Sequence, residues 1–275
     1  MRNPAVAGQF YTSNALELKK EIEMYLKKAG MKKGNAKNIV AGVSPHAGYM
    51  YSGWIAGHTF AEIAANYSDP PTFVIVGPNH TGMGAPVALS LEDWRTPLGT
   101  AKCDVELGKA ITEKASAVLV DESAHKYEHS IEVQLPFLQT IYKDFRFVAI
   151  CMGAQNASNA EAVGKAVFEA GKEIGREVFL LASSDFTHYE PAEKAKAKDS
   201  EAIKCLEKLD YRSFIKIIDE KNYSICGYGP IATAAVYAKL MGASKAEVLK
   251  YASSGDIIGD YSSVVAYASI VFRKR

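Results

Sequence analysis

Cysteine is scarce in this sequence. The 275 residues contain four cysteines, which are widely scattered and form no CxxC pair. This spacing argues against a disulfide framework and against a zinc ribbon. Any thiol that takes part in chemistry here therefore acts singly.

Long apolar runs and an excess of either charge are also missing. No run approaches the ~20 apolar residues that cross a membrane, and the first residues, MRNPAVAGQFY, lack the apolar stretch of a signal peptide. The 32 basic and 31 acidic residues leave a formal net charge of +1, so the chain lacks the excess of positive charge that is typical of proteins that bind nucleic acid or an anionic membrane. We therefore expect a cytoplasmic protein that binds neither.

The chain also lacks a linker. No Ser/Gly/Pro-rich tract, composition break or internal repeat divides it, so we predict a single domain over residues 1–275. A chain of this length buries most of the apolar surface that it exposes when unfolded. Its core therefore needs neither disulfides nor a structural metal.

Short apolar runs alternate with helical patterns, which predicts an α/β fold with helices on both faces of a sheet. Helices are expected near residues 14–30, 53–67, 104–117, 129–143, 157–175, 191–208 and 229–242. Strands are expected within residues 38–48, 72–82, 145–153, 177–191, 247–255 and 262–274, with a hairpin-like stretch at 92–104. Pro136 predicts a break or kink within the fourth helix.

Histidines follow three of the predicted strands. His46 lies in VSPHAG, His80 in VGPNHTG, and Asp185 and His188 in ASSDFTH. Ligands of open α/β sheets bind beyond the carboxyl ends of the strands. If these strands are parallel neighbours, the imidazoles lie at the same edge of the sheet, as a common site requires. A single histidine after a strand is more often a turn residue, so the prediction of a shared site depends on histidine following three different strands.

Cys226, in ICGYGP, is the fourth candidate. It ends a short apolar stretch just before Gly229-Pro230 opens a helix. A helix N-terminus and a nearby metal would both favour thiolate over thiol. The alternative is a small buried hydrophobe, which is the role assigned to the other three cysteines.

Two acid–histidine spacings add candidates. Asp185 and His188 are three residues apart, so a short turn could let the carboxylate orient the imidazole; an aspartate helix cap beside an exposed histidine is the alternative.

In HKYEHSIE, His125, His129 and Glu132 share one face if the segment is helical. We expect His125 at the surface, whereas His129 and Glu132 could reach the crevice and support the site or bind its ligand. His58, inside the helical pattern AGHTFAEI, is expected to be structural.

Together, the motifs SPHAGYMYSG, GPNHTG, EHSIEVQLPFL, SSDFTHY and ICGYGP resemble those of the Memo family, the B component of the AmmeMemoRadiSam protein set. The N-terminal NPAVAGQFY fits as well, so the resemblance covers nearly the whole chain. It implies a fold similar to that of the class III extradiol dioxygenases, which are non-haem iron enzymes. That fold is a three-layer α/β sandwich with a central mixed, mostly parallel sheet and a site at one end.

The resemblance also implies a metal site. The ligand positions of the family fall on His46, His80 and Cys226, with Asp185 and His188 lining the same pocket. The extradiol enzymes use two histidines and a carboxylate, so the cysteine is a departure that puts ring-cleaving oxygenation in doubt. A thiolate beside two imidazoles suits Fe(II), copper or zinc, of which the resemblance favours Fe(II).

Three functions remain open. The leading hypothesis is a metal-binding protein with a redox or dioxygenase-like role, in which His188, oriented by Asp185, is the acid/base group. The competing one is a non-catalytic module that holds a peptide or small molecule; Memo proteins are associated with phosphorylated receptor peptides, but little basic charge clusters near these motifs. A zinc hydrolase ranks third, because two histidines, a thiolate and an open position can also activate water on zinc.

Overall fold

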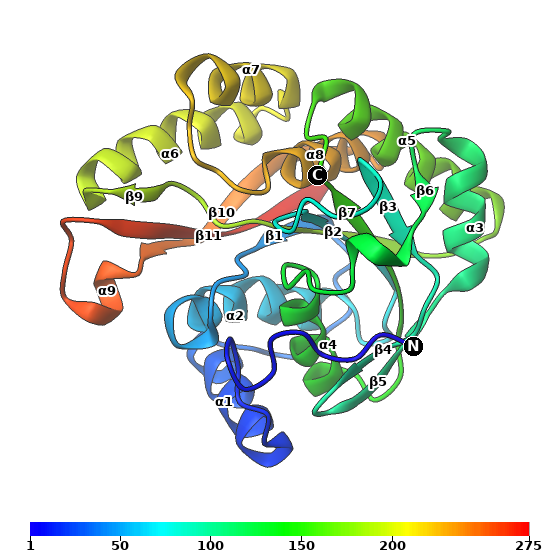
Figure 1. The fold of residues 1–275 in the computed structure, drawn as a ribbon, viewed down its shortest axis with the longest axis horizontal. Helices are drawn as coiled ribbons and strands as arrows, with labels where there is room; N and C mark the ends of the chain where they lie inside the picture. The colour runs from blue at the N-terminus through cyan, green and yellow to red at the C-terminus, as the bar shows by residue number, and fades with distance from the viewer. Residues whose placement is uncertain (275) are drawn as a thin grey trace.

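A central sheet of 11 strands organises residues 1–274, which are those that the computed structural model describes (Figure 1). The strands are β1 (Ile39–Ser44), β2 (Thr72–Pro78), β3 (Val87–Ser90), β4 (Trp94–Thr96), β5 (Gly99–Cys103), β6 (Leu119–Val120), β7 (Arg146–Met152), β8 (Val178–Ser183), β9 (His188–Glu190), β10 (Ala243–Ser253) and β11 (Val264–Lys274). The helices are α1 (Ala15–Lys28), α2 (Tyr49–Asn66), α3 (Val105–Lys114), α4 (Leu135–Ile141), α5 (Ala157–Glu173), α6 (Ala192–Glu207), α7 (Tyr211–Lys221), α8 (Tyr228–Leu240) and α9 (Gly255–Ile258). No helix among these described residues is both long and apolar enough to cross a membrane.

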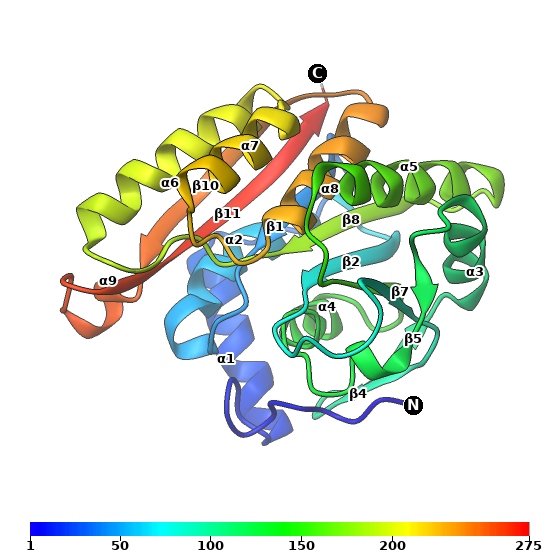
Figure 2. The same cartoon turned by 45° about the horizontal axis from the view of Figure 1, so that its top comes forward.

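The centre of the sheet is parallel. Strands β1, β8, β2 and β7 lie side by side in this order and run in the same direction. Antiparallel strands extend the sheet on both sides, with β11 and β10 beyond β1 and with β3 beyond β7 (Figure 2). The predicted mixed sheet is therefore confirmed, and the carboxyl ends of its four central strands meet at one edge.

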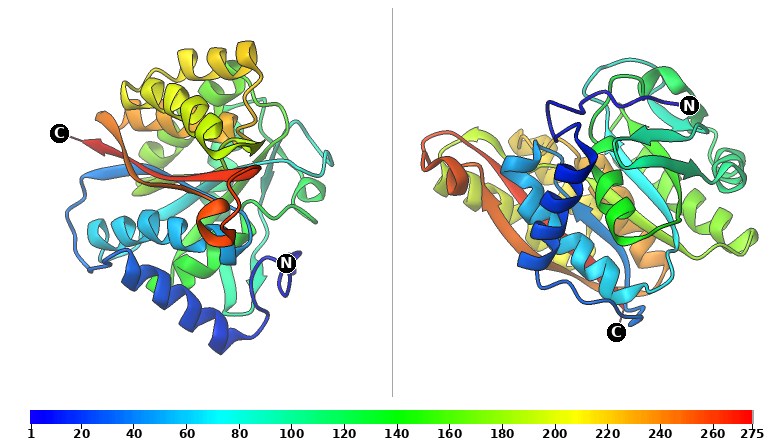
Figure 3. Two further views of the ribbon diagram at one scale, coloured as in Figure 1. Left: turned by 90° about the vertical axis from the view of Figure 1, so that its left-hand side faces the viewer. Right: turned by 90° about the horizontal axis from the view of Figure 1, so that it is seen from below.

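Helices cover both faces and make the three predicted layers. Figure 3 shows the blue helices α1 and α2 on one side of the sheet and the yellow-to-gold α6 and α7 on the other. Every residue of β2 is buried, so Phe73 and Ile75 join the core under α2 and α4, whereas Val74 and Val76 join the core under α5 and α8. Burial on both faces explains the uninterrupted apolar run of this strand.

The predicted fourth helix differs from the one observed. Residues Glu132–Gln134 form one 3-10 turn, and α4 begins only at Leu135, with Pro136 in its first turn. The predicted helix therefore breaks just before Pro136, as expected, and Pro136 is tolerated in the first turn of α4 because an N–H at that position has no partner within its own helix. The segment before Glu132 is irregular, so His125 and His129 share no helix face.

Several elements were not predicted, among them helices α7 and α9 and strands β3 and β6. Helix α7 has an Asp210 N-cap, whose side chain accepts a hydrogen bond from the Ser213 N–H, and buries Phe214, Ile215 and Ile218. Strand β3 is only four residues long and lies fully buried beside β7. Strand β3 is too short to show a periodic pattern, whereas α7 is strongly amphipathic and could have been recognised from the spacing of Phe214, Ile215 and Ile218.

Candidate metal centre

Two strand ends and the loop before α8 bring two imidazoles and a thiol together. His46 follows β1, His80 follows β2, and Cys226 lies two residues before α8. The Sγ atom of Cys226 is 3.1 Å from Nε2 of His46. The candidate ligand atoms of His46, His80 and Cys226 all lie within 4.8 Å of one another. The predicted convergence of these three side chains is confirmed.

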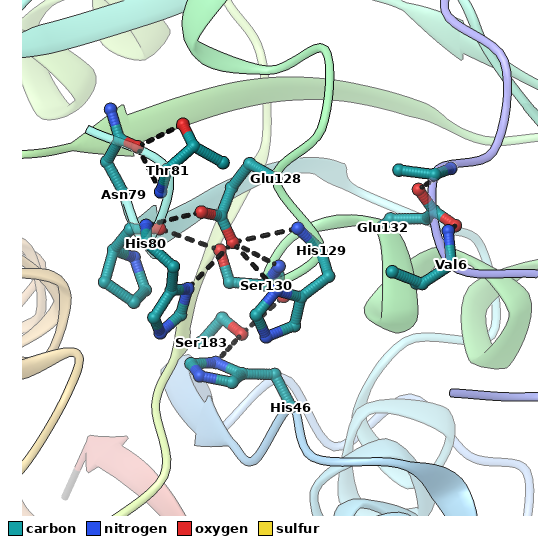
Figure 4. A network of polar contacts seen from close by, with 12 residues as sticks. Val6, His46, Asn79, His80, Thr81, Glu128, His129, Ser130, Glu132 and Ser183 are labelled. Atoms are coloured by element: carbon teal, nitrogen blue, oxygen red, sulfur yellow. Dashed lines mark hydrogen bonds and ion pairs between the residues drawn. The ribbon is translucent and has the colours of Figure 1, made fainter. Parts of the chain in front are cut away.

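Each histidine ring is held through the nitrogen that faces away from this point. Nδ1 of His46 lies 2.9 Å from Oγ of Ser183, and Nδ1 of His80 lies 2.9 Å from Oε1 of Glu128 (Figure 4). These contacts leave Nε2 of both rings available to a ligand. A polar partner on the second nitrogen is typical of metal-binding histidines.

The turn after β2 explains why a buried strand ends in a histidine. Oδ1 of Asn79 accepts hydrogen bonds from the N–H and hydroxyl of Thr81 and from the N–H of Gly82. This side-chain bridge closes a tight turn at the carboxyl edge of the sheet. His80 lies inside the turn, with its side chain 34% exposed. The site is thus open to solvent at His80 while His46 is buried.

Glycine lets the Cys226 loop approach β8. A Cβ atom at Gly227 would lie 2.4 Å from the Ser183 carbonyl oxygen, a distance that no side chain tolerates. The Cys226 carbonyl accepts a hydrogen bond of 2.8 Å from Nε2 of Gln155, and the Asp185 N–H donates to the sulfur at 3.2 Å. These contacts fix the thiol beside the histidines.

The donor set fits a cation. Burial, and then the nearby Asp185 carboxyl, raise the pKa of the Cys226 thiol well above its ordinary value. Burial, and then the imidazoles of His129 and His80, lower the pKa of His46 well below its ordinary value. A bound metal ion would reverse the preference of Cys226 for the protonated thiol, because the ion stabilises a coordinating thiolate.

Asp185 and His188 lie at the same edge, but the expected contact between them is wrong. The buried Asp185 accepts a hydrogen bond of 2.8 Å from the His46 N–H, and burial raises its pKa to about 6. His188 directs Nδ1 to the Ser224 carbonyl oxygen at 2.8 Å instead of to Asp185. Asp185 therefore fixes the turn of His46, and Ser224 orients the His188 ring.

His129 reaches the site, as predicted. Its ring stacks on that of His80 with centroids 4.6 Å apart and lies edge-on to His46 at 5.3 Å. The preceding residue, Glu128, was missed by the sequence reasoning although EHSIE contains it. His80, Glu128 and His129 form a second group whose candidate ligand atoms lie within 4.8 Å of one another. Burial raises the pKa of the Glu128 carboxyl, but the hydrogen bond from His80, the charges of His80 and His129 and the hydrogen bond from the Ser130 N–H together outweigh it and lower the pKa to about 2.

Glu132 binds the N-terminal segment. Its Oε2 accepts hydrogen bonds from Nη1 of Arg2 and the Ala5 N–H, both at 2.7 Å. Its Oε1 accepts hydrogen bonds from the Val6 N–H at 3.1 Å and the Tyr11 hydroxyl at 2.7 Å. Figure 4 shows this carboxylate beside Val6 and apart from the histidine cluster.

The expected surface position of His125 is wrong. The residue is 0% exposed, and its ring packs edge-on against Trp94 with centroids 5.5 Å apart. Burial, and then the Arg2 charge, lower its pKa to about 4. His58 lies half-buried on α2.

The chain is similar to known proteins over almost its whole length. A family model described as Memo-like protein matches residues 2–271. The chain is 46% identical to a MEMO1 family protein of Methanopyrus kandleri over 99% of both chains, and 46% identical to one of Methanosarcina acetivorans over 98% of both. The solved structure of an uncharacterized protein of Escherichia coli K12 aligns with a TM-score of 0.55 at 14% identity, covering 85% of this chain and 99% of that one. This last likeness concerns the fold alone.

Proposed function

Because this chain belongs to the Memo family, we propose that it is a metal-binding protein with a redox or dioxygenase-like activity. His46, His80 and Cys226 hold one divalent ion, for which Fe(II) is the first choice and copper and zinc are the alternatives. The observation that carries the proposal is the convergence of these three side chains within 4.8 Å at the carboxyl edge of the parallel strands.

Fe(II) is preferred on two grounds. The motifs resemble those of a family whose fold is similar to that of non-haem iron enzymes, and two imidazoles with one thiolate are ligands that iron accepts. Three protein ligands leave coordination positions open. When bound, the ion supplies redox chemistry at these open positions.

The protein groups around the ion supply proton transfer and alignment. His188 is the proposed acid/base group: the Ser224 carbonyl holds its Nδ1, so Nε2 is the atom that accepts or donates a proton. Asp185 aligns two ligands, since its carboxylate binds the His46 N–H and its own N–H binds the Cys226 sulfur. His129 presents its ring to the same space and is proposed to contact the bound substrate.

Metal analysis of protein purified without an affinity tag tests the site. We expect about one ion per chain in the wild-type protein and in Cys205→Ser, a control at a partly buried cysteine of α6. The triple variant His46→Ala, His80→Ala, Cys226→Ser should contain none. Equal metal content in the triple variant and the wild-type protein would eliminate this site.

Oxygen consumption tests the activity. Protein loaded anaerobically with Fe(II) is mixed with catechols and then with O₂. His188→Gln should keep its metal and lose at least about 100-fold in rate, as expected for removal of an acid/base group. His58→Gln is the control on α2 and should keep the wild-type rate. Metal binding without oxygen consumption would favour the non-catalytic, ligand-binding alternative, and turnover with zinc in the absence of oxygen would identify a zinc hydrolase.

A further inference from the structure

We propose that Glu128 is the positioning residue of the metal centre and holds His80 and His129 in the arrangement that receives the ion. The inference rests on the proposed metal site. It adds a residue that touches none of the three sulfur or Nε2 ligand atoms and acts through His80.

One carboxylate collects four hydrogen bonds from the segments that form the site. Oε2 of Glu128 accepts from the His80 N–H at 2.5 Å. Oε1 accepts from Nδ1 of His80 at 2.9 Å, from the His129 N–H at 2.9 Å and from the Ser130 N–H at 2.8 Å. The side chain of Glu128 is 0% exposed, so water does not compete for these donors.

The contact with His80 selects one form of its ring. A carboxylate accepts hydrogen bonds only, so Nδ1 of His80 carries the hydrogen and the lone pair lies on Nε2. Oε2 binds the backbone of the same residue, which fixes the main chain and the ring together. Both the tautomer and the direction of Nε2 therefore follow from Glu128. The negative charge also makes the imidazole a stronger donor to a metal.

The same carboxylate shapes the irregular segment that carries His129. By accepting the His129 and Ser130 N–H groups, Glu128 closes a turn on itself and places the His129 ring against His80. The segment is held from behind as well, because Nη2 of Arg2 donates to the Glu128 carbonyl oxygen at 2.6 Å. Glu128 is thus fixed before any ion binds.

A second cation bound by His80, Glu128 and His129 is the competing explanation of this cluster. Oε1 of Glu128 already accepts three hydrogen bonds, and Nδ1 of His80 donates one of them. A cation there would have to displace these protons from a fully buried carboxylate. The contacts therefore favour a hydrogen-bonding role, and the number of ions per chain distinguishes the two.

Cobalt(II) is the probe for the test. Its affinity is measured by competition with a chromophoric chelator, its sulfur coordination by the thiolate charge-transfer absorption, and the stability of the metal-free protein by urea unfolding. Glu128→Gln keeps the side-chain size but removes the charge and places an NH₂ group against an N–H donor. Ser130→Ala is the matched control, because it deletes the 3.0 Å hydrogen bond from Ser130 Oγ to the Pro78 carbonyl, which joins the same two segments without touching a ring.

We expect one cobalt per wild-type chain and an affinity about 10- to 100-fold weaker in Glu128→Gln. Ser130→Ala should lose stability and keep the wild-type affinity. Glu128→Asp retains the charge with a shorter reach and should bind with intermediate affinity; it carries the test if Glu128→Gln does not fold.

Different results would contradict the metal site and the positioning role of Glu128. A wild-type protein that binds no cobalt overturns the proposed metal site and this inference with it. Wild-type affinity in Glu128→Gln, or an equal loss of affinity in Ser130→Ala, overturns the positioning role alone. Two ions per wild-type chain, one of which Glu128→Gln loses, would make Glu128 a ligand and overturn it as well.

Discussion

The sulfur of Cys226 lies 3.1 Å from Nε2 of His46, although 180 positions separate the two residues. The end of β8 brings them together. Ser183 contacts the ring of His46 through its hydroxyl, and the N–H of Asp185 binds the sulfur of Cys226. Since β1 and β8 are parallel neighbours, the site arises from the sheet topology and not from a local motif.

Replacing Glu132 should destabilise the fold. Glu132→Gln leaves the guanidinium of Arg2 buried without its charged partner, so we expect the free energy of unfolding to fall by about 3–5 kcal/mol. Glu177→Gln, which breaks the exposed ion pair with Lys37, should cost less than about 1 kcal/mol. Urea unfolding measures both variants. Similar small losses in the two would show that the N-terminal segment is not anchored by Glu132.

A methyl group at position 227 should disturb the site directly. The new Cβ atom of Gly227→Ala would meet the Ser183 carbonyl oxygen at 2.4 Å, and because this is a backbone atom, the Cys226 loop must move. We expect a loss of about 1–3 kcal/mol in stability, together with weaker cobalt binding. Gly153→Ala is the control, since its Cβ would approach the Pro86 carbonyl oxygen only to 3.6 Å. A Gly227→Ala protein with wild-type affinity would refute this account of the loop.

Asp199 should make stability depend on pH. It is buried on α6, and its carboxylate accepts hydrogen bonds from the Thr187 hydroxyl at 2.6 Å and the Tyr251 hydroxyl at 2.7 Å. Burial raises its pKa from 3.8 to about 6. The folded protein therefore binds more protons than the unfolded chain between these two values, and the contribution of Asp199 to stability falls as the pH rises through this window.

The size of this effect follows from the shift in pKa. At about 1.4 kcal/mol for each pKa unit, and with titration still incomplete at both ends of the range, the wild-type protein should lose about 2 kcal/mol relative to Asp199→Asn between pH 4 and pH 6. Unfolding free energies of the two proteins across this range give the comparison. A difference that stays constant with pH would contradict the assignment.

Prediction from the sequence was most accurate for residues that lie in or directly after regular strands. Strand β2 is buried on both faces, so its apolar run and the turn that delivers His80 could be recognised from the residues. The segment from His125 to Ile131 could not, because residue spacing predicts a shared face only within a regular helix or strand. Its contacts are distant: Arg2, 123 positions away, donates a hydrogen bond to the His125 carbonyl oxygen. Glu128 was missed for the same reason.

A crystal structure of the metal-loaded protein, with anomalous data at the absorption edges of iron, copper and zinc, would test directly whether His46, His80 and Cys226 bind one ion. We expect one anomalous peak at about 2.0–2.3 Å from Nε2 of His46, Nε2 of His80 and Sγ of Cys226. A loaded protein whose only peak lies beyond bonding reach of Cys226 would contradict this expectation.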